Sequence, residues 1–164
     1  MTEQPCEQLD PKMKTVWRIR DTATTTIIYA CALFLGALFG WIDSEMWAWV
    51  IPYCIIITVL FVIALIVVLV ILPPIRYARW RYELRSDFLD IAYGIIWRHR
   101  YVVPFIRVQN TDTKQGPVLR ACGLASVTVS TAAGEMDIPG LRADIADAVR
   151  DRAAELARVA REDV

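Results

Sequence analysis

The sequence predicts a membrane-anchored α+β protein, in which an N-terminal two-helix transmembrane hairpin precedes a small antiparallel β-domain capped by a C-terminal amphipathic helix. Three patterns in the 164 residues predict this order. Two long runs, 22–42 and 46–75, contain no charged residue. Apolar and polar side chains then alternate with a period of two between about residues 80 and 138, as in half-buried strands. After Gly140 the apolar residues instead recur at helical spacing.

The two uncharged runs are long enough to cross a membrane, because about 20 apolar residues span the hydrocarbon core of a bilayer. The expected spans are residues 23–42 and 50–72, and 18 of the 23 residues in the second are Val, Ile, Leu or Phe. Pro73 and Pro74 are expected to end this helix. Only residues 43–49 separate the spans, so the two helices should be antiparallel. A signal peptide is the alternative for the first span, but its apolar stretch is too long and lacks a cleavage site.

Basic residues flank the hairpin on one side only. Four precede the first span and three follow the second, whereas the loop between the spans has two acids and no base. The positive-inside rule therefore predicts a multi-pass protein of the inner (plasma) membrane with both termini in the cytoplasm. The flanking bases are Lys12, Lys14, Arg18, Arg20, Arg76, Arg79 and Arg81.

Two groups of hairpin residues have expected roles in the membrane. Tryptophans near the ends of the spans are expected to form interface belts, and they are Trp17, Trp41, Trp47, Trp49 and Trp80. Small residues about one helical turn apart allow a second helix to approach closely. That helix is either the second span or a helix of another chain, and the small residues are Ala32, Gly36 and Gly40.

Three segments follow from these assignments: an N-terminal cytoplasmic tail (1–22), the hairpin (23–75) and a cytoplasmic β-domain (76–164). The first twenty residues are polar and contain Pro5 and Pro11, and we expect residues 1 to about 10 to be disordered. Residues 12–21 are expected to form a helical or interfacial segment that leads into the first span.

The β-domain is expected to contain six or seven short strands. Trp80, Tyr82 and Leu84 alternate with Arg81, Glu83 and Arg85, and a similar alternation occurs in 97–105, where His99 should be half-buried. The other expected strands are 88–93, 106–111, 127–131 and 135–138, with one helical turn at 118–124, and Pro139-Gly140 should end the sheet region. A helix should follow from about Leu141 to Arg161. Its apolar stripe contains Leu141, Ile145, Val149, Leu156 and Val159 with Ala148 and Ala153, and we expect Ile145 and Leu156 to pack on the sheet.

The polar residues form no convergent catalytic set. The chain has one histidine, and its four cysteines do not share a metal-ligand spacing. No phosphate-binding glycine loop or nucleophile motif occurs. The net charge of zero disfavours nucleic acid as a partner. We therefore expect no enzyme activity, catalytic residue, metal, cofactor or small-molecule substrate.

Several short motifs resemble the bacterial pleckstrin-homology-like (PH-like) domain of the YdbS-like membrane proteins. They are Gly94-Ile95, Val103-Pro104 through Val108-Gln109, Gln115-Gly116-Pro117, Leu119-Arg120, Gly123-Leu124-Ala125 and Val129-Ser130-Thr131-Ala132. The resemblance covers about residues 23–141, and the sequence departs from the family pattern at Asn110-Thr111. It implies two sheets capped by a C-terminal helix in non-catalytic membrane proteins without an assigned role.

Three functions are open at this point. The favoured one is an interaction or assembly module at the cytoplasmic membrane surface, which binds a protein partner or a second copy besides the lipid bilayer. The first alternative is a sensor of anionic lipid headgroups that uses a basic face, and the second is an accessory subunit of a larger membrane complex. A basic pocket at Arg98, Arg100 or Arg107 would favour the sensor, and an exposed apolar patch would favour the module. The residues expected at the membrane surface are Arg76, Arg79, Arg81, Arg98 and Arg100.

Overall fold

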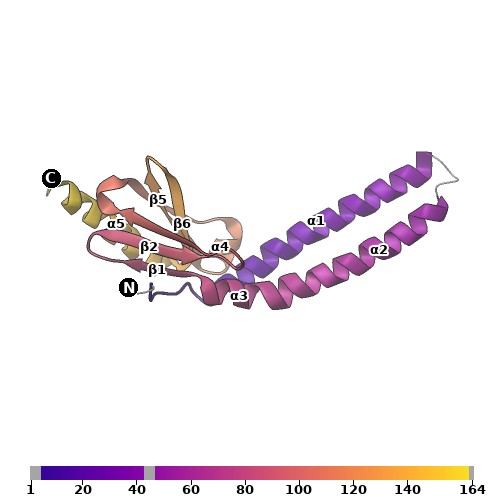
Figure 1. Ribbon diagram of the computed structural model, residues 1–164, viewed down its shortest axis with the longest axis horizontal. Helices are drawn as coiled ribbons and strands as arrows, with labels where there is room; N and C mark the ends of the chain where they lie inside the picture. The colour runs from indigo at the N-terminus through magenta and orange to yellow at the C-terminus, as the bar shows by residue number, and fades with distance from the viewer. Residues whose placement is uncertain (1–4, 43–46, 163–164) are drawn as a thin grey trace. The chain divides into compact units, whose positions relative to one another are not determined.

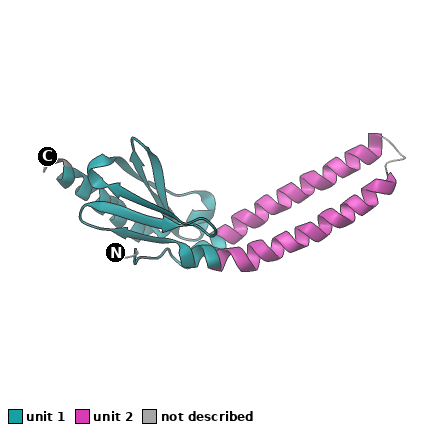
Figure 2. Cartoon of the chain, in the orientation of Figure 1, with its two compact units in different colours: residues 1–16, 75–164 teal, residues 17–74 magenta. Residues whose placement is uncertain are grey.

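The computed structural model describes residues 5–42 and 47–162, which form two compact units. Figure 1 names the helices and strands, and Figure 2 colours the units. One unit is the helical hairpin, residues 17–74. The other is the β-domain, which contains residues 75–164 together with the residues before 17. The boundaries of the three expected segments therefore differ in the structure, because part of the N-terminal tail belongs to the β-domain.

Both expected spans lie within long helices. Helix α1 is Met13–Ile42 and helix α2 is Trp47–Ile66, which is followed directly by a π-helix, η2 (Val67–Ile71), and by helix α3 (Leu72–Arg79). Both helical segments are long and apolar enough to cross a membrane. The expected connecting loop falls mostly outside the described residues, and α2 already begins at Trp47.

The prediction that Pro73 and Pro74 end the second helix is wrong, since α3 contains both. A proline has no N–H, so Pro73 cannot donate to the carbonyl of Leu69 four residues earlier. The guanidinium of Arg18 on α1 donates to that carbonyl instead, with 3.0 Å between Nε and O. Arg18 and the π-helix thus accommodate both prolines within a continuous helical segment.

The small residues of α1 face α2. A Cβ added to Gly36 would lie 2.8 Å from the ring of Tyr53, and one added to Gly40 would lie 3.1 Å from the ring of Trp47. The hydroxyl of Tyr53 also donates to the carbonyl of Ala32 at 2.9 Å. This geometry corresponds to the first of the two expected arrangements, in which the small residues pack within the hairpin.

The β-domain contains two three-stranded antiparallel sheets and a C-terminal helix, which confirms the predicted fold class (Figure 1). The first sheet has the order β1-β2-β3 and the second has the order β4-β5-β6. Helix α5 packs against β4, β5 and the 3₁₀ helix η3. The elements are β1 (Arg81–Leu84), β2 (Phe88–Tyr93), β3 (His99–Pro104), η3 (Phe105–Arg107), β4 (Val108–Lys114), α4 (Pro117–Ala121), β5 (Leu124–Thr131), β6 (Gly134–Arg142) and α5 (Ala143–Glu162).

Alternating residues of the strands build the core, as their period of two predicts. Leu89 and Ile91 of β2 are buried, as are Val127 and Val129 of β5. Phe105 begins η3 and is fully buried. The motif Gln115-Gly116-Pro117 has a structural explanation, because the side-chain amide of Gln115 donates to the carbonyl of Leu124 at 2.8 Å.

Pro139 and Gly140 do not end the sheet, contrary to expectation. Strand β6 continues to Arg142, and its register with β5 shifts between the pairs Val127–Ile138 and Ala125–Leu141. A bulge of this kind accommodates a proline, which has no ladder donor. Gly140 has a φ of +65°, and a Cβ there would collide with the side chain of Met13.

Residues 5–10 are ordered, so the prediction of a disordered tail is wrong for them. Glu7 forms an antiparallel bridge with Tyr82 of β1, and the N–H of Asp10 donates to the carbonyl of Gly140 at 3.0 Å. Leu9 is buried, and its carbonyl accepts a 3.1 Å hydrogen bond from the hydroxyl of Tyr77. Burial and the nearby Glu7 carboxylate raise the pKa of Tyr82. These contacts with residues distant in the sequence outweigh the low local hydrophobicity of the segment.

Helix α5 has the predicted position but a different buried face. Its buried residues are Ala146, Ala153 and Ala157, whereas Ile145 is 41% exposed and Leu156 is half-buried. The prediction that Ile145 packs on the sheet is therefore wrong. Small side chains allow a helix to approach strands closely, and the three alanines recur at helical spacing. The helix places this alanine row inward and leaves Ile145 at its margin.

Candidate functional site

Four of the five arginines expected at the membrane surface line one pocket of the β-domain. Its volume is about 330 Å³. Arg79 comes from α3, Arg81 from β1, Arg98 from the loop between β2 and β3, and Arg100 from β3. The other lining residues are Pro5, Ala78, Ala92, Tyr93, Gly94 and His99, and none of them is acidic. We call this site the basic pocket. Arg76 is half-buried on α3 and does not line it.

Two of the arginines bind neutral backbone groups. Arg81 donates through Nη1 to the carbonyl of Trp80 at 2.8 Å, and Arg79 donates to the carbonyl of Ile95. A carbonyl fixes the position of a guanidinium and leaves its charge uncancelled. Arg98 has no ion pair or hydrogen bond within residues 5–42 and 47–162. Three positive charges are thus available in the basic pocket.

Arg100 has a structural partner. Asp90 of β2 is fully buried, and its carboxylate accepts from Nε and Nη2 of Arg100 at 3.0 and 2.5 Å. The hydrogen bond with Asp90 raises the pKa of Arg100, which keeps the guanidinium charged. This bidentate pair satisfies the buried acid, so Arg100 adds little net charge to the basic pocket.

Tyr93 and His99 line the basic pocket and belong to a cluster of aromatic rings. Tyr93 lies 5.9 Å from Trp80, 5.5 Å from His99 and 5.8 Å from Tyr101, measured between ring centroids. Burial and a hydrogen bond with Tyr101 raise the pKa of Tyr93. His99 is exposed, which corrects its expected half-buried position. The alternating sequence pattern runs along β3, but only the C-terminal end of the strand, from Val103, is buried in the core.

A fixed loop with an apolar tip adjoins the basic pocket. Gly94 has a φ of +118°, and a Cβ there would lie 1.9 Å from the carbonyl oxygen of Trp97. Only glycine fits this turn, and the bond from Arg79 to Ile95 holds the loop from α3. The fixed turn leaves Ile96 and Trp97 85% and 78% exposed, although Trp97 is expected in a strand.

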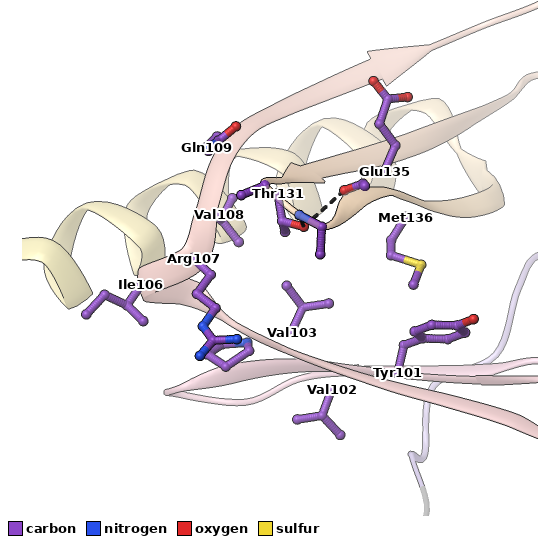
Figure 3. Close-up of a pocket in the computed structure, with 14 residues that line it drawn as sticks. Tyr101, Val102, Val103, Ile106, Arg107, Val108, Gln109, Thr131, Glu135 and Met136 are labelled. Carbon is purple, nitrogen blue, oxygen red and sulfur yellow. Dashed lines mark hydrogen bonds between the residues drawn. The ribbon is translucent and has the colours of Figure 1, made fainter.

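An open cleft of about 1000 Å³ lies elsewhere in the β-domain (Figure 3). One wall is the end of β3 with η3 and the start of β4, and the other is the turn between β5 and β6. The turn is closed by the hydroxyl of Thr131, which donates to the carbonyl of Gly134 at 3.0 Å. The cleft is mostly apolar, with Val102 and Ile106 about half exposed, and Arg107 and Glu135 are its charged residues.

The expected tryptophan belt is only partly exposed. Trp41, Trp47 and Trp49 at the loop end of the hairpin are exposed to 83%, 49% and 75%. Trp17 and Trp80 are buried, at 4% and 8% exposed, which corrects their expected place in a belt. The stacking of Trp80 on Tyr93 explains its burial.

Sequence reasoning missed two parts of these sites. No sequence pattern singles out Asp90, which is a mid-strand residue of β2 paired with Arg100. The cleft has no local pattern, because it forms between segments distant in the sequence. The described residues contain no group of three His, Cys, Asp or Glu side chains that could hold a metal ion.

Comparison with known proteins identifies the family. The family model described as "Bacterial PH domain" matches residues 25–157. The chain is 37% identical over 169 residues to "UPF0699 transmembrane protein YdbS" of Bacillus subtilis (strain 168), with both proteins covered completely. No solved structure matches. These matches confirm the resemblance seen in the sequence motifs, and they show that the chain belongs to the bacterial PH-domain family as a YdbS-like membrane protein.

Proposed function

We propose that the chain is a non-catalytic integral membrane protein whose PH-like domain is an interaction module at the cytoplasmic membrane surface. In this function the cleft binds an extended segment of a partner protein. The observation that supports the proposal is the open, mostly apolar cleft along β3, with Val102 and Ile106 exposed on its wall.

An extended segment fits this cleft better than a compact ligand does, because β3 is an edge strand. Among the described strands, its neighbour in the sheet is β2 on one side and none on the other. Half of the backbone groups of an antiparallel strand point away from its neighbour, and at an edge they can pair with an added strand. Main-chain hydrogen bonds then supply affinity, and side-chain contacts such as those offered by Val102 supply specificity.

Site-specific photo-crosslinking of the full chain in native membranes tests the cleft. A benzoylphenylalanine at Val102, which is 51% exposed, should form one adduct of defined mass with a protein. The same probe at Val159, which is 41% exposed on α5, is the matched control and should not form that adduct. Ile106→Glu places a charge at an exposed position of the cleft and should abolish the Val102 adduct. An adduct that also forms at Val159, or that survives Ile106→Glu, would exclude the cleft as its binding site.

The proposed location is the plasma membrane, with both termini in the cytoplasm. It is supported by the one-sided distribution of basic residues and by the two apolar helical segments. The topology can be tested with single-cysteine variants in intact cells. A membrane-impermeant maleimide should label Ser44→Cys in the hairpin loop, and it should label the native, exposed Cys6 only after permeabilisation. Labelling of Cys6 in intact cells would reverse the topology.

A further inference from the structure

We propose that the β-domain also docks on the membrane itself. In this arrangement the basic pocket binds the phosphate of an anionic phospholipid while Ile96 and Trp97 insert into the interfacial layer of the same leaflet. The proposal goes beyond the interaction module, because its residues differ from the cleft residues that contact a partner protein.

The exposed tip is the first observation that supports it. Ile96 and Trp97 are adjacent, large and apolar, yet more than three quarters of each is exposed. Tryptophan is enriched at membrane interfaces, where its ring is buried and its N–H remains hydrated. Gly94 and Arg79 fix the loop before any lipid binds. A loop that is already ordered loses less conformational entropy on insertion.

The charge of the adjoining basic pocket is the second observation. Arg79, Arg81 and Arg98 supply three charges, and no acidic side chain among the described residues lines the pocket. Guanidinium groups match the geometry of phosphate oxygens. The N–H groups of Arg98 are free for a ligand among the described residues, whereas Asp90 occupies Arg100. The pocket therefore selects an anion, and Arg98 is its principal binding residue.

Two facts favour a lipid phosphate over a soluble one. The apolar tip lies between Gly94 and Arg98, so the residues that would enter the membrane and the principal phosphate-binding arginine belong to one loop. The pocket is also tethered to the hairpin. Arg79 comes seven residues after Leu72, the last residue of the expected second span, and seven residues reach at most about 25 Å. The chain length thus keeps the pocket within reach of the headgroups.

The depth of the loop tip in a bilayer tests this proposal. A nitroxide is attached to Ile96→Cys in the full chain, with the four native cysteines replaced by alanine, and the protein is reconstituted into nanodiscs. In phosphatidylglycerol nanodiscs the label should be several-fold less accessible to a water-soluble nickel chelate than in phosphatidylcholine nanodiscs. The matched control is Ile145→Cys, an isoleucine 41% exposed on α5, whose label should remain in water with either lipid.

A second pair of variants tests the phosphate contact. Arg98→Gln should remove most of the difference between the two lipids, whereas Arg152→Gln, which removes one charge from the exposed surface of α5, should leave it intact. High salt should also weaken the difference, because exposed charges are screened over about 10 Å at 0.1 M. A label that stays in water with phosphatidylglycerol, equal protection with both lipids, or equal effects of Arg98→Gln and Arg152→Gln would each overturn the proposal. Protection by inorganic phosphate in phosphatidylcholine nanodiscs would overturn the assignment to lipid.

Discussion

Replacing Ala146 by aspartate is expected to unfold the β-domain. Ala146 is fully buried where α5 packs against the sheets. An aspartate there would bury a carboxylate without a partner, which costs several kcal/mol and exceeds the effect of most single substitutions. Thermal unfolding of the full chain in mild detergent, followed by near-UV circular dichroism, should show a variant without a cooperative transition of the β-domain.

Ile145→Asp is the matched control, because it makes the same chemical change one residue earlier. Both positions lie in the first turns of α5, so the helix dipole favours an added acid at each. Ile145 is 41% exposed, and the new carboxylate would remain hydrated. Its melting temperature should change little. Equal destabilisation by the two variants would show that the buried face of α5 is not the alanine row.

Arg100→Leu should be the next most damaging substitution. It removes the bidentate partner of Asp90, which is fully buried. Without Arg100 the carboxylate of Asp90 stays buried and loses its compensating charge, which is strongly destabilising even though Arg100 itself is partly exposed. The melting temperature of the β-domain should therefore fall clearly below that of the unchanged chain.

A double variant separates this effect from general damage to β3. When Asp90→Asn is combined with Arg100→Leu, no charge remains to be buried, so part of the lost stability should return. The same detergent-based melting experiment measures it. If the double variant is as unstable as the sum of the single ones, the two side chains do not act as a pair.

The sequence predicts those parts of the structure that local periodicity determines. The uncharged runs indicate the two helical segments, and the alternation in 80–85 indicates strand β1, in which Tyr82 is buried. The four arginines of the basic pocket are all among the five that the sequence suggests for the membrane surface, although Arg98 and Arg100 lie far beyond the second span.

Features that depend on contacts between distant residues cannot be predicted in this way. Hydrophobicity alone predicts that Ile145 lies on the buried face of α5. In the structure that face carries alanines, whose small side chains let the helix pack closely on the sheet. The helix continues through Pro73 because Arg18 donates a hydrogen bond to the carbonyl of Leu69, and these two residues are 51 positions apart in the sequence. The alternation in the sequence predicts that Trp97 lies in a strand. The tight turn at Gly94 instead places Trp97 in a loop, where its side chain is exposed.

The bridge between Glu7 and Tyr82 has a consequence for biogenesis. The segment that contains Glu7 emerges from the ribosome before the hairpin, whereas Gly140, which accepts the hydrogen bond of Asp10, is translated 130 residues later. The β-domain therefore cannot finish folding until both membrane helices have been synthesised. Until β1 is translated, the N-terminal segment lacks the strand with which it pairs. Synthesis of β6 and α5 is thus the step that completes the domain.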